Sequence, residues 1–114
     1  MELTRSMIVL CLIVLPLVAG GSLLGGWQPI KDVNDPKVVE IAKYAVSEHN
    51  KQSKSDLTYE RVDEGQTQVV SGIRYRLVVQ AKNGAAGKSK FYLATVVDGA
   101  TGKRVLKSFK YFLG

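Results

Sequence analysis

Alternating apolar and polar positions dominate the second half of the chain and predict a β-sheet. Apolar residues recur at every second position from Ile73 to Ala81, which is the period of a strand with one buried face. Turn signals such as Asn83-Gly84 separate similar runs, so strands are expected at about 57–63, 70–81, 90–97 and 105–112. Short connections between successive strands are typical of antiparallel hairpins.

A helical pattern precedes these strands. Asp35 is placed to cap a helix that begins at Pro36 and is expected to end near Asn50. An apolar stripe at helical spacing is formed by Val38, Val39, Ile41, Ala42, Ala45, Val46 and His49. Together these elements predict an α+β fold, in which one N-terminal α-helix packs across a four- to five-stranded antiparallel β-sheet. Trp27 and Ile30 are expected to pack on this fold.

The connection between the first two strands has an unusual composition. The stretch 68–72 reads Gln-Val-Val-Ser-Gly, so the apolar Val69 and Val70 stand close to the flexible Gly72. Connections between strands are usually polar because their backbone is wet. In one interpretation the valines form a hairpin tip that is buried in a partner. In the other they belong to the strands, and the turn lies at Glu64-Gly65.

The first residues differ in kind from the rest. Arg5 precedes an apolar run from Met7 to Ala19, and small residues follow, as in a secretory signal peptide. The run is short for a membrane span. Residues 1–21 are therefore predicted to be a signal peptide that is cleaved ahead of Leu23, and residues 22–114 to form one secreted domain, extracellular or vacuolar. Cys11, the single cysteine, lies inside the leader, so the mature chain has no disulfide.

Charge narrows the choice of partner. The mature chain carries 15 basic and 9 acidic residues, scattered rather than gathered in one run. Such a balance aids solubility and favours an acidic partner. No stacking-aromatic or groove-helix motif accompanies it, so a nucleic-acid partner is not expected. An electrostatic surface module that depends on Arg74 and Arg76 is the alternative type of binding protein.

The sequence contains none of the motifs that would indicate an enzyme. The sole histidine, His49, has no serine in a nucleophile elbow, and no glycine-rich loop opens a helix. No cluster of cysteine, histidine and carboxylate has metal-ligand spacing. The sequence therefore predicts a binding protein that is not an enzyme and has no cofactor or metal.

Three motifs together resemble the plant cystatins, protein inhibitors of papain-like cysteine proteases. They are Gly25-Gly26-Trp27, the helix segment Ile41–Asn50 with the sequence Ile-Ala-Lys-Tyr-Ala-Val-Ser-Glu-His-Asn, and the stretch 68–72. The resemblance covers essentially all of the mature chain. It implies the cystatin fold and reversible, competitive, non-covalent inhibition, by a wedge of three segments that enters the active-site cleft of a papain-like cysteine protease.

The resemblance also implies the residues that bind the protease. Leu23 and Leu24 would fill substrate pockets, and the two glycines would turn the chain away from the catalytic thiolate. The expected contact residues are Leu23, Leu24, Gly25, Gly26, Gln68, Val69, Val70, Ser71, Gly72, Ala100 and Thr101. The inhibitor is expected to be a monomer, and a dimer formed by hairpin exchange is left open.

One part of the family pattern is missing. The family places a Pro-Trp pair in the second hairpin, whereas this chain has Asp-Gly-Ala-Thr-Gly at 98–102. A buried tryptophan is a common binding hot spot. Two interpretations follow: a weakened but functional inhibitor, or a cystatin-fold binding module with weak or lost inhibition.

Overall fold

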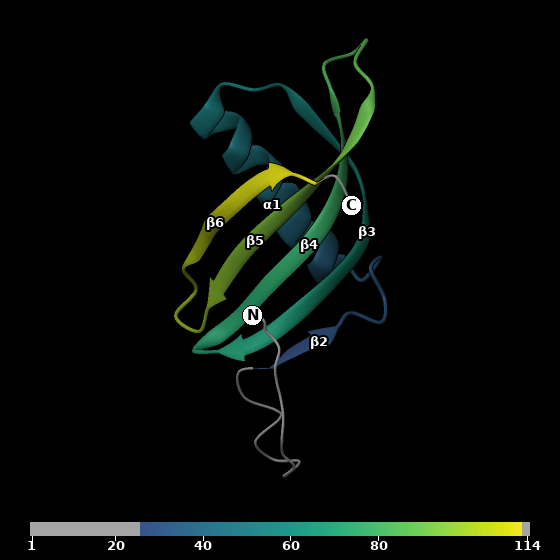
Figure 1. The fold of residues 1–114 in the computed structure, drawn as a ribbon. Helices are drawn as coiled ribbons and strands as arrows, with labels where there is room; N and C mark the ends of the chain where they lie inside the picture. The colour runs from purple at the N-terminus through teal and green to yellow at the C-terminus, as the bar shows by residue number, and fades with distance from the viewer. Residues whose placement is uncertain (1–25, 113–114) are drawn as a thin grey trace, which may run out of the picture.

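The computed structural model describes residues 26–112, which form one helix and a sheet (Figure 1). In chain order the elements are β2 (Trp27–Pro29), α1 (Pro36–Ser53), β3 (Leu57–Val70), β4 (Gly72–Asn83), β5 (Ser89–Gly99) and β6 (Arg104–Tyr111). The strands form one five-stranded antiparallel sheet in the order β2-β3-β4-β5-β6. Helix α1 lies across one face of the sheet (Figure 1). The predicted α+β architecture is confirmed.

The core lies between the helix and the sheet face that it covers. Strand β4 supplies the centre of this face, since Tyr75, Leu77, Val79 and Ala81 are buried as their alternation predicts. The helix contributes Val38, Ile41, Ala42, Ala45 and Val46. Ala42 and Ala45 are fully buried, and their small side chains let the helix backbone lie close to the sheet. Within residues 26–112 no helix covers the other face of the sheet.

Strand β3 is longer than predicted. It runs without interruption from Leu57 to Val70, instead of ending near Asp63, and β4 begins at Gly72 rather than Val70. The interpretation that places a turn at Glu64-Gly65 is therefore wrong. A Cβ on Gly65 would lie 2.6 Å from Leu77 Cδ2 and 3.0 Å from Ile30 Cδ1. The glycine at this position makes room for side chains that cross it, and it does not reverse the chain.

Two bulges explain why the apolar pattern of β3 is hard to read. The pairing with β4 is irregular between Tyr59 and Arg61 and again between Val62 and Glu64. Each bulge inserts one residue that has no partner on β4. Tyr59 and Val62 therefore share a face although three positions separate them, and both pack in or against the core.

The helix begins as predicted and ends later. The Asp35 side chain accepts a hydrogen bond from Lys37 N, and Pro36 is the first helical residue. The C-terminus lies at Ser53, not near Asn50, because Lys54 adopts the left-handed conformation that ends the helix. The Asn50 side chain instead donates to Leu57 O at 2.9 Å and accepts from Leu57 N at 3.0 Å. Asn50 thus joins the helix to the start of β3.

His49 has a structural environment. Its ring stacks on Phe109 of β6 with 4.1 Å between the ring centroids. Burial lowers the pKa of the His49 imidazole, because the charged form loses hydration there. The side chain packs the end of the helix against the sheet.

Candidate functional site

Three segments meet at one end of the sheet (Figure 1). The first is the start of β2, where Trp27 pairs with Gln68 and thus brings Gly26 alongside the end of β3. The second is the β3–β4 turn at Val70–Gly72, and the third is the β5–β6 turn that follows Gly99. Because Gly72 pairs with Gly99, the two turns lie side by side. The predicted site residues among 26–112 are therefore brought together at one edge.

Direct backbone contacts join the two turns. Ala100 N donates a hydrogen bond to Ser71 O at 3.1 Å. Gly72 has φ of +133°, and a Cβ there would lie 2.5 Å from Asp98 O and 2.8 Å from Ala100 N. A residue with a side chain would thus collide with backbone atoms of the second turn. Glycine at position 72 allows the turns to pack against each other.

The tip residues present their side chains to solvent. Val69 is 44% exposed, Val70 is half-buried, and Ser71, Ala100 and Thr101 are exposed. Both valines are the last residues of β3, so they belong to a strand and also stand at the tip of its hairpin. Leu23, Leu24 and Gly25 lie outside the described residues.

A polar layer that includes Arg74 and Arg76 lies directly behind the tips, and its contacts with Trp27, Gln66 and Gln68 could not be predicted from the sequence. The guanidinium of Arg76 sits 4.1 Å from the centre of the Trp27 ring, and its Nε donates to Gln66 Oε1 at 3.0 Å. Arg74 Nη1 donates to Gln68 Oε1 at 3.1 Å. Burial lowers the pKa of Arg76. The contact of Arg76 with Trp27 attaches β2 to the sheet and so fixes where the chain enters the fold at Gly26, and the other two join β3 to β4.

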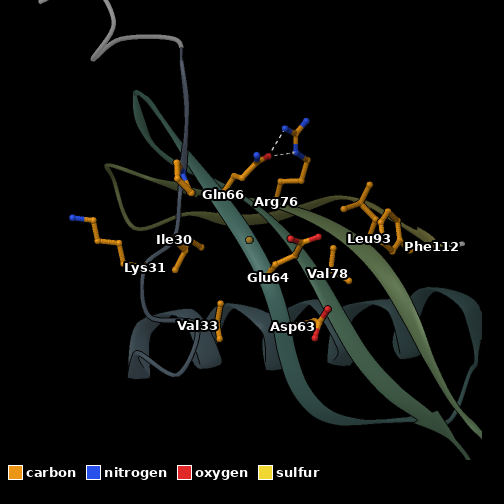
Figure 2. A pocket seen from close by; sticks show the side chains of 12 residues that line it. Ile30, Lys31, Val33, Asp63, Glu64, Gln66, Arg76, Val78, Leu93 and Phe112 are labelled. Carbon is orange, nitrogen blue, oxygen red and sulfur yellow. Dashed lines mark hydrogen bonds between the residues drawn. The ribbon is translucent and has the colours of Figure 1, made fainter. Parts of the chain in front are cut away.

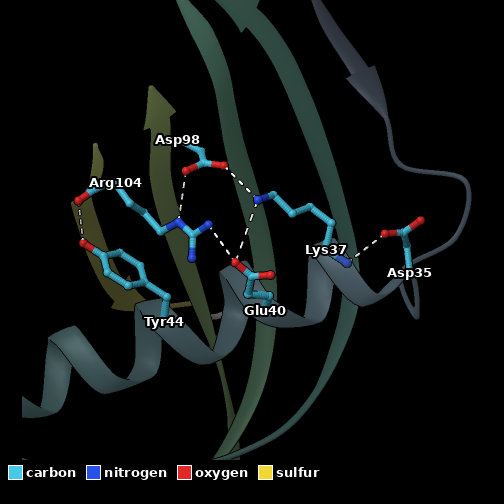
Figure 3. Close-up of polar contacts among 6 residues, drawn as sticks. All are labelled: Asp35, Lys37, Glu40, Tyr44, Asp98 and Arg104. Carbon is cyan, nitrogen blue, oxygen red and sulfur yellow. Dashed lines mark hydrogen bonds and ion pairs between the residues drawn. The ribbon is translucent and has the colours of Figure 1, made fainter. Parts of the chain in front are cut away.

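A second group that sequence reasoning missed connects the second turn to the helix (Figure 3). Arg104 Nη2 lies 2.7 Å from Glu40 Oε2, and Arg104 Nε donates to Asp98 Oδ1 at 3.0 Å. Lys37 Nζ lies 3.2 Å from Asp98 Oδ2, and Tyr44 OH donates to Arg104 O at 2.8 Å. Asp98 and Arg104 flank the turn, so this network holds both of its ends against α1.

Replacing Arg104 with glutamine is expected to lower the free energy of unfolding by about 1–2 kcal/mol at pH 7, because Asp98 loses a partly buried charged partner. The Arg104 hydrogen bond is the main cause that lowers the pKa of the Asp98 and Glu40 carboxyls. Carboxylates with a lowered folded pKa stabilise the fold above their unfolded pKa of about 4 and lose that effect as pH falls through the folded value. The difference in melting temperature between wild type and variant, measured from pH 7 to pH 2, should therefore become smaller as the pH falls. A difference that persists unchanged at pH 2 would contradict this role.

A hollow of about 590 Å³ lies between the segment after β2 and the neighbouring strands (Figure 2). Ile30, Val33 and Gly65 line it on one side, and Val78 and Phe112 on another. It contains no residue of the two turns. Among residues 26–112 no group of histidine, cysteine, aspartate or glutamate could hold a metal ion. In the same range no helix is long and apolar enough to cross a membrane.

The sequence is similar to those of known proteinase inhibitors. A family model described as aspartic acid proteinase inhibitor matches residues 30–112. Cysteine proteinase inhibitor 5 of Arabidopsis thaliana is 54% identical over 90 residues, which are 78% of this chain and 73% of the relative. Cysteine proteinase inhibitor 8 of Oryza sativa subsp. japonica is 46% identical over 91 residues, 79% of this chain and 73% of the relative.

Solved structures support the fold. The crystal structure of a salivary cystatin from the soft tick Ornithodoros moubata superposes with a TM-score of 0.66 at 20% identity, covering 77% of this chain and 97% of the other. The crystal structure of Al-CPI gives a TM-score of 0.57 at 24% identity, covering 77% of this chain and 100% of the other. At these identities the likeness extends to the arrangement of the helix and the sheet.

Proposed function

Because the chain belongs to the plant cystatins, a family of proteinase inhibitors and not of enzymes, we propose that it inhibits papain-like cysteine proteases reversibly, by inserting one edge of its sheet into the active-site cleft. The edge consists of the N-terminal segment that ends at Gly26, the β3–β4 turn and the β5–β6 turn. We call these three segments the wedge.

One observation carries the proposal. The two turns are bonded through Ala100 N and Ser71 O, and the pairing of Trp27 with Gln68 brings Gly26, where the N-terminal segment ends, to the same edge. Three chain segments that are distant in sequence thereby form one narrow, continuous edge with an exposed apolar residue, Val69. A narrow edge with apolar side chains fits a cleft that is itself concave and largely apolar.

Each segment has a separate proposed role. Leu23 and Leu24 occupy substrate pockets, and Gly25 and Gly26 turn the backbone away from the catalytic thiolate before a cleavable bond reaches it. The stretch Gln68–Gly72 covers the catalytic residues, and Ala100 with Thr101 contacts the opposite wall of the cleft. The wedge occupies the cleft that a substrate would enter, so inhibition is competitive. No step in this scheme forms a covalent bond, so inhibition is reversible.

The test is a titration of papain-like enzymes with two forms of the protein, one beginning at Leu23 and one beginning at Gly25. The longer form is expected to inhibit, and the shorter form to inhibit at least about tenfold less tightly. Each buried leucine contributes roughly 1.5–3 kcal/mol before the ordering of a free chain end is subtracted. Equal inhibition by the two forms would contradict the role of the leucines. The absence of inhibition by the longer form would overturn the proposed function.

A parallel titration of a pepsin-like aspartic protease distinguishes the second candidate function. That candidate is favoured by the description of the family model that matches residues 30–112. Inhibition of the aspartic enzyme alone would replace the proposed function with this candidate. Inhibition of the papain-like enzyme alone would reject the candidate.

Replacing Thr101 with tryptophan is expected to tighten inhibition of a papain-like enzyme by at least about tenfold. Thr101 is exposed in the second turn, and a tryptophan there can bury about 150–250 Å² in the cleft. At about 25 cal/mol per Å² this is roughly 4–6 kcal/mol, of which ordering of the side chain and desolvation of the indole N–H remove about half. Inhibition constants of Thr101→Trp and of the control Thr101→Ala would be compared. A tryptophan variant that folds and binds no better than the alanine control would contradict this role for the turn.

A proline at position 100, as in the Pro-Trp pair of the family, is not expected to tighten binding. Ala100 N is the donor of the bond to Ser71 O, and proline has no N–H to donate. Ala100→Pro would therefore break the contact between the two turns, although proline stiffens many other turns. The double variant Ala100→Pro with Thr101→Trp is expected to gain less than Thr101→Trp alone.

We propose in addition that residues 1–21 direct secretion and are removed ahead of Leu23, as their composition predicts. N-terminal sequencing of the secreted protein tests this proposal. A mature chain that begins at Gly25 or later would lack both leucines and would contradict the role proposed for them.

A further inference from the structure

Charge is distributed very unevenly between the two parts of the described chain. From Gly26 to Glu64, eight carboxylate residues accompany six lysines and arginines. From Gly65 to Phe112, nine lysines and arginines accompany a single carboxylate, Asp98. The basic residues are scattered along the chain, but the carboxylates are segregated. The end of β3 and strands β4, β5 and β6 therefore carry a large excess of positive charge.

This excess is not balanced by ion pairs. Asp98 is already bound by Arg104 and Lys37, and Arg104 also binds Glu40 of the helix. Within residues 26–112 no carboxylate lies within ion-pair distance of the lysines of β4–β6 and their turns, which are Lys82, Lys88, Lys90, Lys103, Lys107 and Lys110. We call these six lysines the lysine surface. All are exposed except Lys82, which is half-buried.

We propose that Lys103 and Lys107, the lysines of this surface that lie beside the wedge, select, among the proteases that admit the wedge, enzymes with an excess of carboxylates beside the cleft, and that they do so by accelerating association. This inference rests on the proposed function and adds to it the charge class of the partner. Unpaired charges that surround a binding site act mainly on the association rate, because they steer the encounter before the contact surfaces desolvate.

Two residues of the lysine surface, Lys103 and Lys107, lie next to the wedge. Lys103 directly follows the second turn, and Lys107 lies on the next part of β6. Lysine is a hydrated point charge on a flexible stem and is depleted at the centres of protein interfaces, so these side chains suit the rim of a complex. A second copy of the chain is a poor occupant, since it would place like charges against each other.

The length of the sheet provides an internal control. Strand β4 has 12 residues, which at about 3.3 Å per residue separates the wedge from the opposite end of the sheet by roughly 36 Å. Lys88 and Lys90 lie at that opposite end, where β5 begins. The Debye length is about 8 Å at 0.15 M salt and about 30 Å at 0.01 M. A protease at the wedge should therefore sense the distant lysines only at low salt.

The experiment compares two double variants with the same change in net charge, Lys103→Glu with Lys107→Glu and Lys88→Glu with Lys90→Glu. Association and dissociation rates are measured by stopped flow with two papain-like enzymes, one of net negative and one of net positive charge at the assay pH. At about 0.15 M salt the Lys103/Lys107 variant should associate roughly 5–20-fold more slowly with the negative enzyme, and the Lys88/Lys90 variant less than about twofold more slowly. At about 0.01 M both should be slow, and at about 1 M both should match wild type. Dissociation rates should stay unchanged, and the positive enzyme should associate faster with the Lys103/Lys107 variant.

Three results would overturn the inference while leaving the proposed function intact. They are an effect confined to the dissociation rate, an association rate that ignores salt, and equal effects of the two double variants at about 0.15 M. The last would indicate that association depends on the net charge of the inhibitor and not on charges beside the wedge. If the Lys103/Lys107 variant unfolds, Lys103→Gln with Lys107→Gln takes its place, with half the change in charge. A wild-type protein that inhibits neither enzyme would overturn the proposed function and this inference together.

Discussion

Replacing Val69 with aspartate is expected to weaken inhibition of a papain-like protease by at least about 100-fold while shifting the melting temperature by no more than a few degrees. In the free protein Val69 is 44% exposed, so a carboxylate at this position keeps much of its hydration and the fold loses little. In the complex the same carboxylate would be enclosed in the cleft without a partner. Burying an unpaired charge costs about 3 kcal/mol or more, which corresponds to a loss of more than 100-fold.

A matched control separates this effect from a general effect of adding a charge. Phe91 is 37% exposed and thus similar to Val69, but it pairs with Gln80 toward the opposite end of the sheet. Phe91→Asp is expected to leave the inhibition constant within about twofold of wild type, because a charge at that distance is screened. Inhibition constants and thermal unfolding would be measured for both variants. A large loss of stability in Val69→Asp with unchanged inhibition would show that the valine serves the core and not a partner.

Replacing Gly72 with alanine is expected to impair both folding and inhibition. Its φ of +133° is a conformation that only glycine adopts readily, and the added Cβ would lie 2.5 Å from Asp98 O and 2.8 Å from Gly99 Cα. These are backbone atoms, so the two turns must move apart and the bond between Ala100 N and Ser71 O is lost. Backbone strain and the lost contact together are expected to lower the free energy of unfolding by about 2–4 kcal/mol. The molecules that still fold should inhibit at least about tenfold less tightly, because the edge has widened.

Gly84 provides the comparison for this variant. It also has positive φ, +71°, but the nearest atom to an added Cβ is Asp56 Oδ2 at 4.0 Å. Gly84→Ala is therefore expected to cost only about 1 kcal/mol of stability from the left-handed backbone, with inhibition unchanged. Urea unfolding and inhibition constants would be measured for both variants. If Gly84→Ala and Gly72→Ala lowered inhibition equally, the packing of the two turns would not matter for binding.

Local pattern was sufficient to predict the buried faces of β4 and α1. The alternation from Ile73 to Ala81 predicted the buried face of β4, and the apolar stripe predicted the buried face of α1, because burial follows the periodicity of the element itself. The bounds of β3 could not be obtained in this way. Its bulges depend on pairing with β4, and the role of Gly65 depends on Leu77 and Ile30, which are remote in sequence.

The candidate site shows the same limit. The sequence motif identified the tip at 68–72, but the supports of the wedge are contacts between distant segments. Glu40 and Arg104, for example, are 64 positions apart, and no periodicity links them. A signal was nevertheless present in the chain. Asp98 is the single carboxylate after Glu64, and a lone acid within a basic segment at a turn indicates a structural ion pair.

The two bulges of β3 have a consequence for the behaviour of the protein at high concentration. Among residues 26–112, β2 pairs only with residues 66–68 of β3, so the longer part of β3 is paired with β4 on one side and has no strand on the other. A flat, unpaired edge is a template on which another chain can add a strand and begin an aggregate. Here the bulges at Glu60 and Asp63 break the regular spacing of the free backbone groups, and Asp63 adds an exposed carboxylate to this strand. An incoming strand would meet a kinked, charged border with which it cannot stay in register, so the open edge is protected from aggregation.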